Sequence, residues 1–193
     1  MTATNKPDGD LARLHERLAH DAETRALIDV AYRTIDSPVG PLLVAASRHG
    51  LVRVAYQSEG FDGVLQTMAD RISPRVLHAP ARLDGAAREL DEYFSGRRTS
   101  FDLPLDFALT RGFRAEVQRL LPTIAYGDTA SYAELARAAG RPRAFRAVGS
   151  ACATNPLPVV VPCHRVLRAD GTLGGYVGGV EAKRTLLDLE ASS

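Results

Sequence analysis

The sequence predicts an α+β fold, in which a small N-terminal antiparallel-sheet domain precedes a mainly helical C-terminal domain with a helix-turn-helix. Short strand patterns joined by tight turns fill residues 30–56, whereas helical patterns dominate after Thr110. Hydrophobic residues make up 45% of the 193 residues and charged residues 24%, so the chain can bury a core. We expect an N-terminal extension, an α/β domain and a C-terminal domain, over residues 1–29, 30–105 and 106–193.

The first half of the chain shows one helical pattern and then three strand patterns. Leu11, Leu14 and Leu18 recur at helical spacing, which predicts a short amphipathic helix over residues 10–27. Strands separated by turn-forming residues are expected next, over residues 30–36, 41–47 and 51–56. Two helices and an extended connector complete this half, over residues 61–72, 82–95 and 99–106.

The second half contains two short helices joined by a glycine. Ser131 and Glu134 form a Ser-x-x-Glu capping box, which begins a helix that Gly140 ends. Pro142 suits the first turn of the next helix, expected over residues 142–153. Two short helices in this arrangement outline a helix-turn-helix, although similar helical pairs also occur in ordinary protein cores.

The cysteine content and the hydropathy restrict the class of protein. Only Cys152 and Cys163 are present, which excludes a disulfide framework and a cysteine-rich metal cluster. The first ten residues are polar and carry no apolar stretch typical of a secretion signal. The apolar stretch Leu157–Pro162 is too short to cross a bilayer. We therefore expect a cytoplasmic protein, in a reducing compartment that keeps thiols usable.

Positive charge is concentrated in one part of a chain whose net charge is only +1. Between residues 135 and 169 there is no acidic residue, and six arginines occur there: Arg137, Arg141, Arg143, Arg146, Arg165 and Arg168. A concentrated basic face suits phosphate binding because electrostatic attraction decays over a Debye length. The alternative is a solvated arginine-rich surface without a ligand.

The second helix of the helix-turn-helix carries small residues on one face. Ala144, Ala147 and Ala151 are spaced at i, i+3 and i+7, with Ser150 beside them, and Arg146 projects from the same helix. Small side chains let a backbone approach another surface closely. That surface is either a neighbouring helix or the floor of a DNA groove.

The segment that leads to Cys163 is the most informative in the chain. Its prolines, at positions 156, 158 and 162, exclude a regular helix and predict a rigid, extended approach. The apolar run Val159–Val161 should be buried, which places Cys163 at the edge of the core. Burial normally makes a cysteine inert by raising its pKa, but the adjacent His164 can take the proton and expose a thiolate. The residues alone leave open a structural cysteine beside an incidental histidine.

The longer string Pro162-Cys163-His164-Arg165-Val166 resembles the active-site signature of the O6-alkylguanine-DNA alkyltransferases, or methylated-DNA–protein-cysteine methyltransferases. Further segments stand in that family's order and spacing: Ser131–Ala136, Arg146–Ser150, Asn155-Pro156, Gly174–Gly179 and Lys183–Glu190. This resemblance covers residues 110–190. Residues 30–105 resemble the family's more variable N-terminal domain, and residues 1–29 match nothing in it.

The resemblance implies direct-reversal DNA repair that needs no cofactor and no metal. Members flip O6-alkylguanine out of duplex DNA and transfer its alkyl group irreversibly to a cysteine, once per protein molecule. O4-alkylthymine is a second candidate substrate. By position, Cys163 is the nucleophile and acceptor, and His164 is a base that acts through a bridging water. Glu190 orients the imidazole, and Asn155 braces the turn before the cysteine.

The resemblance also implies how DNA is held. Arg146 is the finger that fills the space of the extruded base, and Tyr132 presses on the phosphate 3′ to it. The second helix lies in the minor groove, where its small residues fit. The other expected DNA contacts are Ser131, Ala144, Ala147, Ser150 and Ala151. The residues expected to line the guanine pocket are Tyr176, Val166, Gly174, Gly175, Val177 and Gly178.

The sequence departs from the family's common pattern at Gln118, where tryptophan is usual, at Phe145, where a small residue is usual, and at Val177 on the pocket rim.

Three other functions compete with alkyl transfer. A non-catalytic lesion binder would lack the acceptor cysteine, a Cys-His hydrolase would need a separate oxyanion motif, and a regulator would carry base-reading side chains on its recognition helix. We expect a monomer whose partner is double-stranded DNA with O6-alkylguanine, and no membrane; cooperative assembly on DNA is left open.

Overall fold

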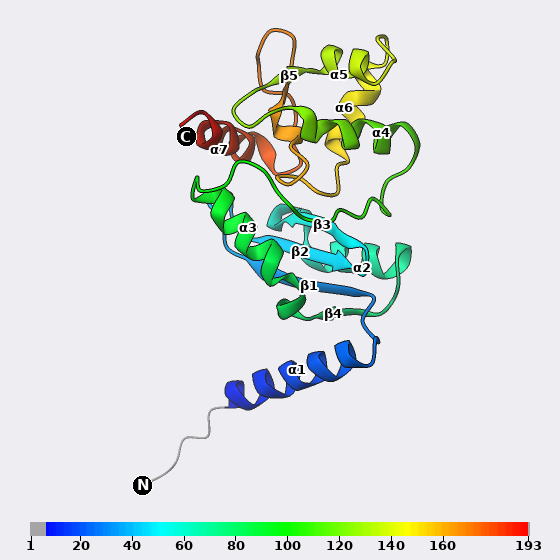
Figure 1. The fold of residues 1–193 in the computed structure, drawn as a ribbon, viewed down its shortest axis with the longest axis vertical. Helices are drawn as coiled ribbons and strands as arrows, with labels where there is room; N and C mark the ends of the chain where they lie inside the picture. The colour runs from blue at the N-terminus through cyan, green and yellow to red at the C-terminus, as the bar shows by residue number, and fades with distance from the viewer. Residues whose placement is uncertain (1–6, 193) are drawn as a thin grey trace.

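The computed structural model describes residues 7–192, which form a four-stranded sheet and a mainly helical half that packs on it (Figure 1). The helices are α1 (Pro7–Thr24), α2 (Phe61–Arg71), α3 (Asp84–Phe94), α4 (Gly112–Leu120), α5 (Tyr132–Ala138), α6 (Phe145–Ala153) and α7 (Gly179–Ala191). The strands are β1 (Val30–Ile35), β2 (Leu42–Ser47), β3 (Gly50–Tyr56), β4 (Val76–His78), β5 (Ala130–Ser131) and β6 (Val166–Leu167). The α+β class is therefore the one that the sequence predicts.

The larger sheet has the strand order β3-β2-β1-β4. The three longer strands pair antiparallel, with Ile35 opposite Leu42 and Leu42 opposite Tyr56. The edge strand β4 was not predicted, and it pairs parallel to β1, which makes the whole sheet mixed. A strand of three residues is too short to show an alternating pattern in the sequence. Parallel pairing needs a long connection between strands, and here the chain runs through α2 between β3 and β4 before it pairs with β1.

Both faces of the sheet are covered, as the burial of every residue of β2 shows. Successive side chains of a strand point to opposite faces. Leu43 and Ala45 accordingly pack in a cluster with Met68 of α2, whereas Leu42 and Val44 face α3 and the C-terminal half.

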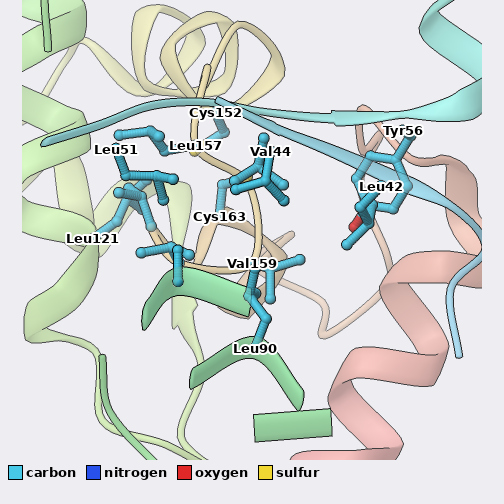
Figure 2. Close-up of a cluster of buried hydrophobic side chains, with 14 of the residues drawn as sticks. Leu42, Val44, Leu51, Tyr56, Leu90, Leu121, Cys152, Leu157, Val159 and Cys163 are labelled. Carbon is cyan, nitrogen blue, oxygen red and sulfur yellow. The ribbon is translucent and has the colours of Figure 1, made fainter. Parts of the chain in front are cut away.

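The second of these clusters joins the two halves of the chain. In Figure 2, Val44 of β2 and Leu90 of α3 lie around Cys163 of the C-terminal half. The backbone also connects the halves, because the Val54 amide of β3 donates a hydrogen bond to the Pro156 carbonyl at 2.9 Å. The sheet thus supports the segment that carries Cys163.

The capping box at the start of α5 is confirmed. The Ser131 hydroxyl accepts a hydrogen bond from the Glu134 amide at 3.2 Å, and the Glu134 carboxylate accepts one from the Ser131 amide at 2.7 Å. These two bonds satisfy amide groups that the first turn of a helix leaves unpaired.

The second helix of the pair begins later than predicted. α6 starts at Phe145, and Pro142 lies in a turn that the Ala144 amide closes on the Arg141 carbonyl at 2.8 Å. Proline is favoured at the second position of such a turn, where its fixed φ angle fits as well as it does in a first helical turn. The prediction that Pro142 opens the helix is therefore wrong.

The N-terminal extension contains the predicted helix, α1, but its leucines do not join a core. Leu11, Leu14 and Leu18 are 67%, 60% and 56% exposed, and Figure 1 shows α1 at the far end of the molecule from the C-terminal half. Residues 1–6 of the predicted extension lie outside the described residues. Among residues 7–192, no helix combines the length and hydropathy needed to cross a membrane.

The segment that follows α3 passes close to the start of β3 at Pro104, and this close approach requires a glycine at position 50. Gly50 has a φ angle of +137°, and a Cβ atom there would overlap the Pro104 carbonyl group. Gly50→Ala is expected to lower the free energy of unfolding by about 2 kcal/mol or more, because both backbone strain and the clash act on the folded state. Urea denaturation monitored by circular dichroism measures this.

Gly63→Ala is the matched control. Gly63 is exposed in α2 with open space around it, so alanine should leave stability unchanged or raise it by up to about 1 kcal/mol. Equal effects of the two substitutions would show that the close approach at Pro104 does not constrain the fold.

Candidate active site

The segment before Cys163 is a folded turn rather than the extended approach that the prolines predict. The Val161 amide donates to the Leu157 carbonyl at 2.8 Å, and Val159 adopts a φ angle of +72°. A β-branched residue rarely adopts this conformation, which costs about 1–3 kcal/mol. Val159–Val161 is buried as predicted, and this packing holds the strained turn in place.

Asn155 spans this turn and contacts the cysteine. Its side-chain amide donates to the Val161 carbonyl at 2.8 Å and lies 3.2 Å from Cys163 Sγ, while its Oδ1 atom accepts from the Leu157 amide at 3.0 Å. Asn155 is itself buried, so few alternative partners compete for these bonds. The position of Sγ is fixed relative to the turn.

Cys163 is only 2% exposed, and its protonation state follows from that burial. Burial raises the pKa of the thiol to about 11, although the Asn155 hydrogen bond and the charge of Lys183 act in the opposite direction. With this raised pKa the resting side chain is a thiol at neutral pH, so the thiolate that His164 is expected to expose would have to form during the reaction. A base must remove the proton before the sulfur can act as a nucleophile.

His164 is completely buried beside Cys163 in the same short 3-10 turn (Cys163–Arg165). Its Nε2 atom lies 2.9 Å from Glu190 Oε1, and among the described residues its Nδ1 atom has no hydrogen-bond partner. Burial lowers the pKa of the imidazole, and the hydrogen bond with Glu190 only partly offsets this. A neutral ring that donates Nε2–H to the carboxylate leaves Nδ1 as an acceptor.

Glu190, near the end of α7, is the centre of a buried polar network. Arg165 binds it in bidentate fashion, with Nε–Oε2 and Nη2–Oε1 distances of 2.9 Å, and the Tyr93 hydroxyl donates to Oε1 at 2.6 Å. Burial would raise the pKa of this carboxyl, but the hydrogen bonds from His164 and Arg165 outweigh it and lower the pKa to about 2. Glu190 is therefore ionised at neutral pH.

Arg165 does not belong to the exposed basic face that the sequence predicts. It is buried, it also donates to the Ile124 carbonyl at 2.6 Å, and its charge is used by Glu190. The other five arginines of that set are exposed. The segment between residues 135 and 169 thus has a basic face, but a smaller one than expected.

The loop of residues 174–179 lies between two tyrosines that come from different halves of the chain. A Cβ atom at Gly174 would overlap the Tyr132 hydroxyl, and one at Gly178 would come within 2.5–2.7 Å of the Tyr56 ring. The Tyr56 hydroxyl lies 2.9 Å from the Tyr176 hydroxyl. These glycines are therefore required by the close approach of the aromatic rings.

The remaining residues predicted to line the pocket differ in exposure. Val166 is fully buried in β6, Tyr176 and Val177 are half-buried, and Gly175 is exposed with open space around its Cα. The Tyr176 ring meets the His164 ring edge-on at a centroid distance of 6.3 Å. The predicted pocket and the Cys163–Arg165 turn are consequently neighbours.

The helix α6 presents only part of its predicted small-residue face. Arg146 and Ala147 are exposed and Ala144 is half-buried, as is Ser150, but Ala151 is completely buried. The Ala151 carbonyl accepts a hydrogen bond from the Gln118 side chain of α4 at 2.9 Å. The predicted DNA contact of Ala151 is therefore wrong, because this end of the stripe packs against a neighbouring helix.

Several residues of the site could not be found from their local sequence. Tyr56 and Tyr93 come from β3 and α3, and nothing near them marks a polar role. Lys183 stands within a motif of the sequence that gives it no role, yet its ammonium group is buried and donates to the Val166 carbonyl at 2.5 Å. The described residues contain no group of three or more His, Cys, Asp or Glu side chains that could hold a metal ion.

The fold and site define a two-part α+β protein in which a helix-turn-helix is joined to a buried cysteine, histidine and glutamate. Comparison with known families gives two matches: the ribonuclease-like domain of 6-O-methylguanine DNA methyltransferase over residues 30–107, and its DNA-binding domain over residues 112–192. The chain belongs to the 6-O-methylguanine DNA methyltransferase family. Its enzyme class is that of the methylated-DNA–protein-cysteine methyltransferases.

Individual relatives agree with this assignment. A methylated-DNA–protein-cysteine methyltransferase of Mycobacterium tuberculosis is 43% identical over 166 residues, which cover 84% of this chain and 93% of the relative. The bifunctional transcriptional activator and DNA repair enzyme Ada of Escherichia coli is 39% identical over 97% of this chain and 52% of its own length. The crystal structure of Mycobacterium tuberculosis OGT in complex with DNA matches with a TM-score of 0.72 and 42% identity, over 84% of this chain and 93% of that one.

The low pKa of Glu190 predicts a defined acid sensitivity. A carboxyl group with a pKa of about 2 in the folded state, against an ordinary 4.5, stabilises the fold above pH 4.5 and loses this contribution as the pH falls toward 2. The loss should reach about 3 kcal/mol for this group. Urea titrations of the native protein and of Glu190→Gln between pH 2 and pH 7 measure it.

Glu190→Gln should lack this acid-dependent part and should be less stable by about 3–5 kcal/mol at pH 7, because Arg165 is left buried without its counter-charge. Glu181→Gln, an exposed carboxylate at the start of α7, is the control and should behave like the native protein. An unchanged pH dependence in Glu190→Gln would contradict the assignment.

Proposed function

We propose that this protein repairs O6-alkylguanine in duplex DNA by transferring the alkyl group irreversibly to Cys163. The observation that carries the proposal is a buried cysteine directly followed in the chain by a buried histidine whose Nδ1 atom has no partner among the described residues. The Nε2 atom of His164 is occupied by Glu190, and its Nδ1 atom is left to accept a proton. Membership of the 6-O-methylguanine DNA methyltransferase family supplies the substrate class.

The transfer moves one proton and one alkyl group. His164 Nδ1 takes the proton of Cys163 Sγ through a water molecule, and Glu190 stabilises the imidazolium that forms. The thiolate then attacks the alkyl carbon, so that a carbon–sulfur bond forms while the carbon–O6 bond breaks. The guanine leaves with the electron pair and takes up a proton, which restores the neutral imidazole and an unmodified base.

Burial of Cys163 supports this order of events. A thiol with a pKa of about 11 carries almost no thiolate at neutral pH, so it is protected from oxidants and electrophiles in solution. The thiolate is needed only when a substrate is bound. The thioether product is too stable to hydrolyse, so we infer that each molecule acts once. O4-alkylthymine carries its alkyl group on an equivalent exocyclic oxygen, and we include it as a second substrate.

DNA binding is assigned to α6 and the start of α5. With α6 in the minor groove, exposed Arg146 enters the duplex and Ala147 lets the backbone approach. Tyr132 stands against Gly174 at one wall of the guanine pocket, where it can press on the phosphate of the rotated nucleotide. Base flipping is needed because the alkyl carbon cannot reach a buried sulfur from within the stack.

We further propose that the protein acts as a monomer in the cytoplasm, where both of its cysteines, which are free thiols, stay reduced. A lesion binder that does not transfer the alkyl group is the main alternative. The presence of Cys163, in contact with Asn155, favours transfer over binding alone.

Mass spectrometry tests the acceptor directly. After incubation with a duplex that contains one O6-methylguanine, the native protein should gain a single methyl group on Cys163, to a limit of one per molecule. Cys163→Ala should gain none, because the nucleophile is absent, but should still bind the duplex.

Cys152→Ala provides a matched control, since Cys152 is the other buried free cysteine. It should remain fully active as a methyl acceptor. A methyl group on Cys152, or a native protein that binds the lesion and stays unmodified, would contradict the proposed function.

The finger role of Arg146 predicts a dependence on the duplex. Arg146→Ala should slow methyl transfer from duplex DNA by about tenfold or more at saturating protein, because the extruded base is no longer replaced in the stack. Transfer from single-stranded O6-methylguanine DNA should change much less, since no base pair must be opened. Single-turnover kinetics on both substrates measure this difference.

Arg88→Ala is the control for removal of one surface arginine. It should alter neither rate, because Arg88 lies on α3, where its ion-pair partner is Glu92 of the same helix at 3.9 Å. Equal slowing of Arg146→Ala on both substrates would rule out a role in base flipping.

A further inference from the structure

A groove with a volume of about 700 Å³ lies where α2, α4 and α6 meet. Three arginines and three hydroxyl-bearing residues contribute to its lining, namely Arg71, Arg111, Arg114, Thr110, Ser150 and Thr154. None of the described residues that line it is acidic. The groove is therefore a basic surface rich in hydrogen-bond donors, and it is separate from the pocket around Cys163.

The arginines of this groove are available to a ligand. Arg111 and Arg114 are exposed, and within residues 7–192 neither has an ion-pair partner. Arg71, the last residue of α2, donates one hydrogen bond to the Leu109 carbonyl at 2.9 Å, which holds its guanidinium against the groove wall. Three such cations around one hollow attract a polyanion more strongly than they would if spread over the surface.

The groove continues directly from the exposed face of α6. Ala147 and Ser150 form part of its wall, and Arg146 extends from the same helix. A minor groove is only about 6 Å wide, so a helix that enters it has phosphate backbones close on either side. With α6 in the minor groove as proposed above, one of these strands is expected along the side of α6 on which the three arginines lie.

We propose that this groove binds the sugar-phosphate backbone of one DNA strand, and that Arg71 makes the N-terminal half a second DNA-binding element. This inference rests on the proposed function for the placement of α6 against DNA. Arg71 and Arg111 come from opposite sides of the connector between the halves, so a strand in the groove contacts both. The partner is a continuous phosphate backbone, which the groove recognises by charge and not by base sequence.

Salt-dependent binding tests the proposal. The probe is an undamaged duplex, so that the result does not depend on alkyl transfer. A triple variant, Arg71→Gln with Arg111→Gln and Arg114→Gln, should bind at least about tenfold more weakly at about 0.1 M salt. The slope of log K against log salt should become shallower by about 0.9 for each phosphate that is no longer neutralised, hence by about 2–3 in total.

The matched control removes three exposed arginines elsewhere: Arg88→Gln and Arg97→Gln near α3 and Arg184→Gln on α7. In Figure 1, α3 and α7 lie on the left of the molecule and α2 on the right. The control should keep the native slope to within about 0.9, although its net charge falls by the same amount. Equal slopes in the two triple variants would show that only net charge matters and would overturn the proposal.

The single variant Arg71→Gln decides whether the N-terminal half takes part. Its slope should become shallower by about 0.9, the value for one phosphate, and its thermal unfolding should confirm that the fold is intact. A native slope in this variant, with a reduced slope in the triple variant, would overturn the role of the N-terminal half. If the native protein does not transfer methyl groups, the proposed function fails, but these binding measurements still decide the groove.

Discussion

The structure depends on one buried carboxylate, that of Glu190. It receives hydrogen bonds from Arg165 and His164 of the 3-10 turn and from Tyr93 of α3, so a single side chain ties α7, the reactive turn and the N-terminal half together. A buried negative charge is unfavourable unless it is paired and hydrogen-bonded. Each partner is therefore required by the others, and the position of His164 follows from a network that neither half of the chain could form alone.

Burial of the proposed reactive centre lets one cysteine serve both the stability of the core and the proposed reaction. Cys163 lies in the same cluster as the side chains of the sheet, so the sulfur is part of the core and its thiol form is favoured (Figure 2). Burial lowers the pKa of His164 and so favours its neutral form as well. In the proposed mechanism, these two neutral neighbours exchange a proton through a water molecule, and the cysteine is thus a latent nucleophile. The strained φ angle at Val159 lies four residues before the sulfur, in a turn that Asn155 and the surrounding core hold in one conformation.

The surface that we propose for DNA binding differs from the buried site in what it requires of its side chains. Side chains that bind DNA must be exposed, whereas those that hold α6 in place must be buried. Arg146 and Ala147, near the start of α6, are exposed, and Ala151, near its end, packs on α4. Gln118 takes part in this packing through its amide group, although its Oε1 atom has no partner among the described residues. Gln118 of α4 thus stands where tryptophan is usual in the family, and its hydrogen bond to Ala151 still holds α6 against α4. The groove of arginines beside it extends the basic surface across the connector.

The sequence by itself determined the features that depend on neighbours in the chain. The hairpin strands follow from strand propensity and from the turn residues between them, and the Ser131–Glu134 capping box follows from hydrogen bonds between residues three positions apart. The adjacency of Cys163 and His164 is written in the sequence itself. The tertiary structure decided what depends on burial and on distant partners. Only packing turned Arg165 inward to Glu190, brought Tyr93 and Tyr56 to the site, paired β4 with β1 and covered Ala151. In each case the deciding energy is the desolvation or pairing of a group by residues far away in the sequence, and no local pattern records that energy.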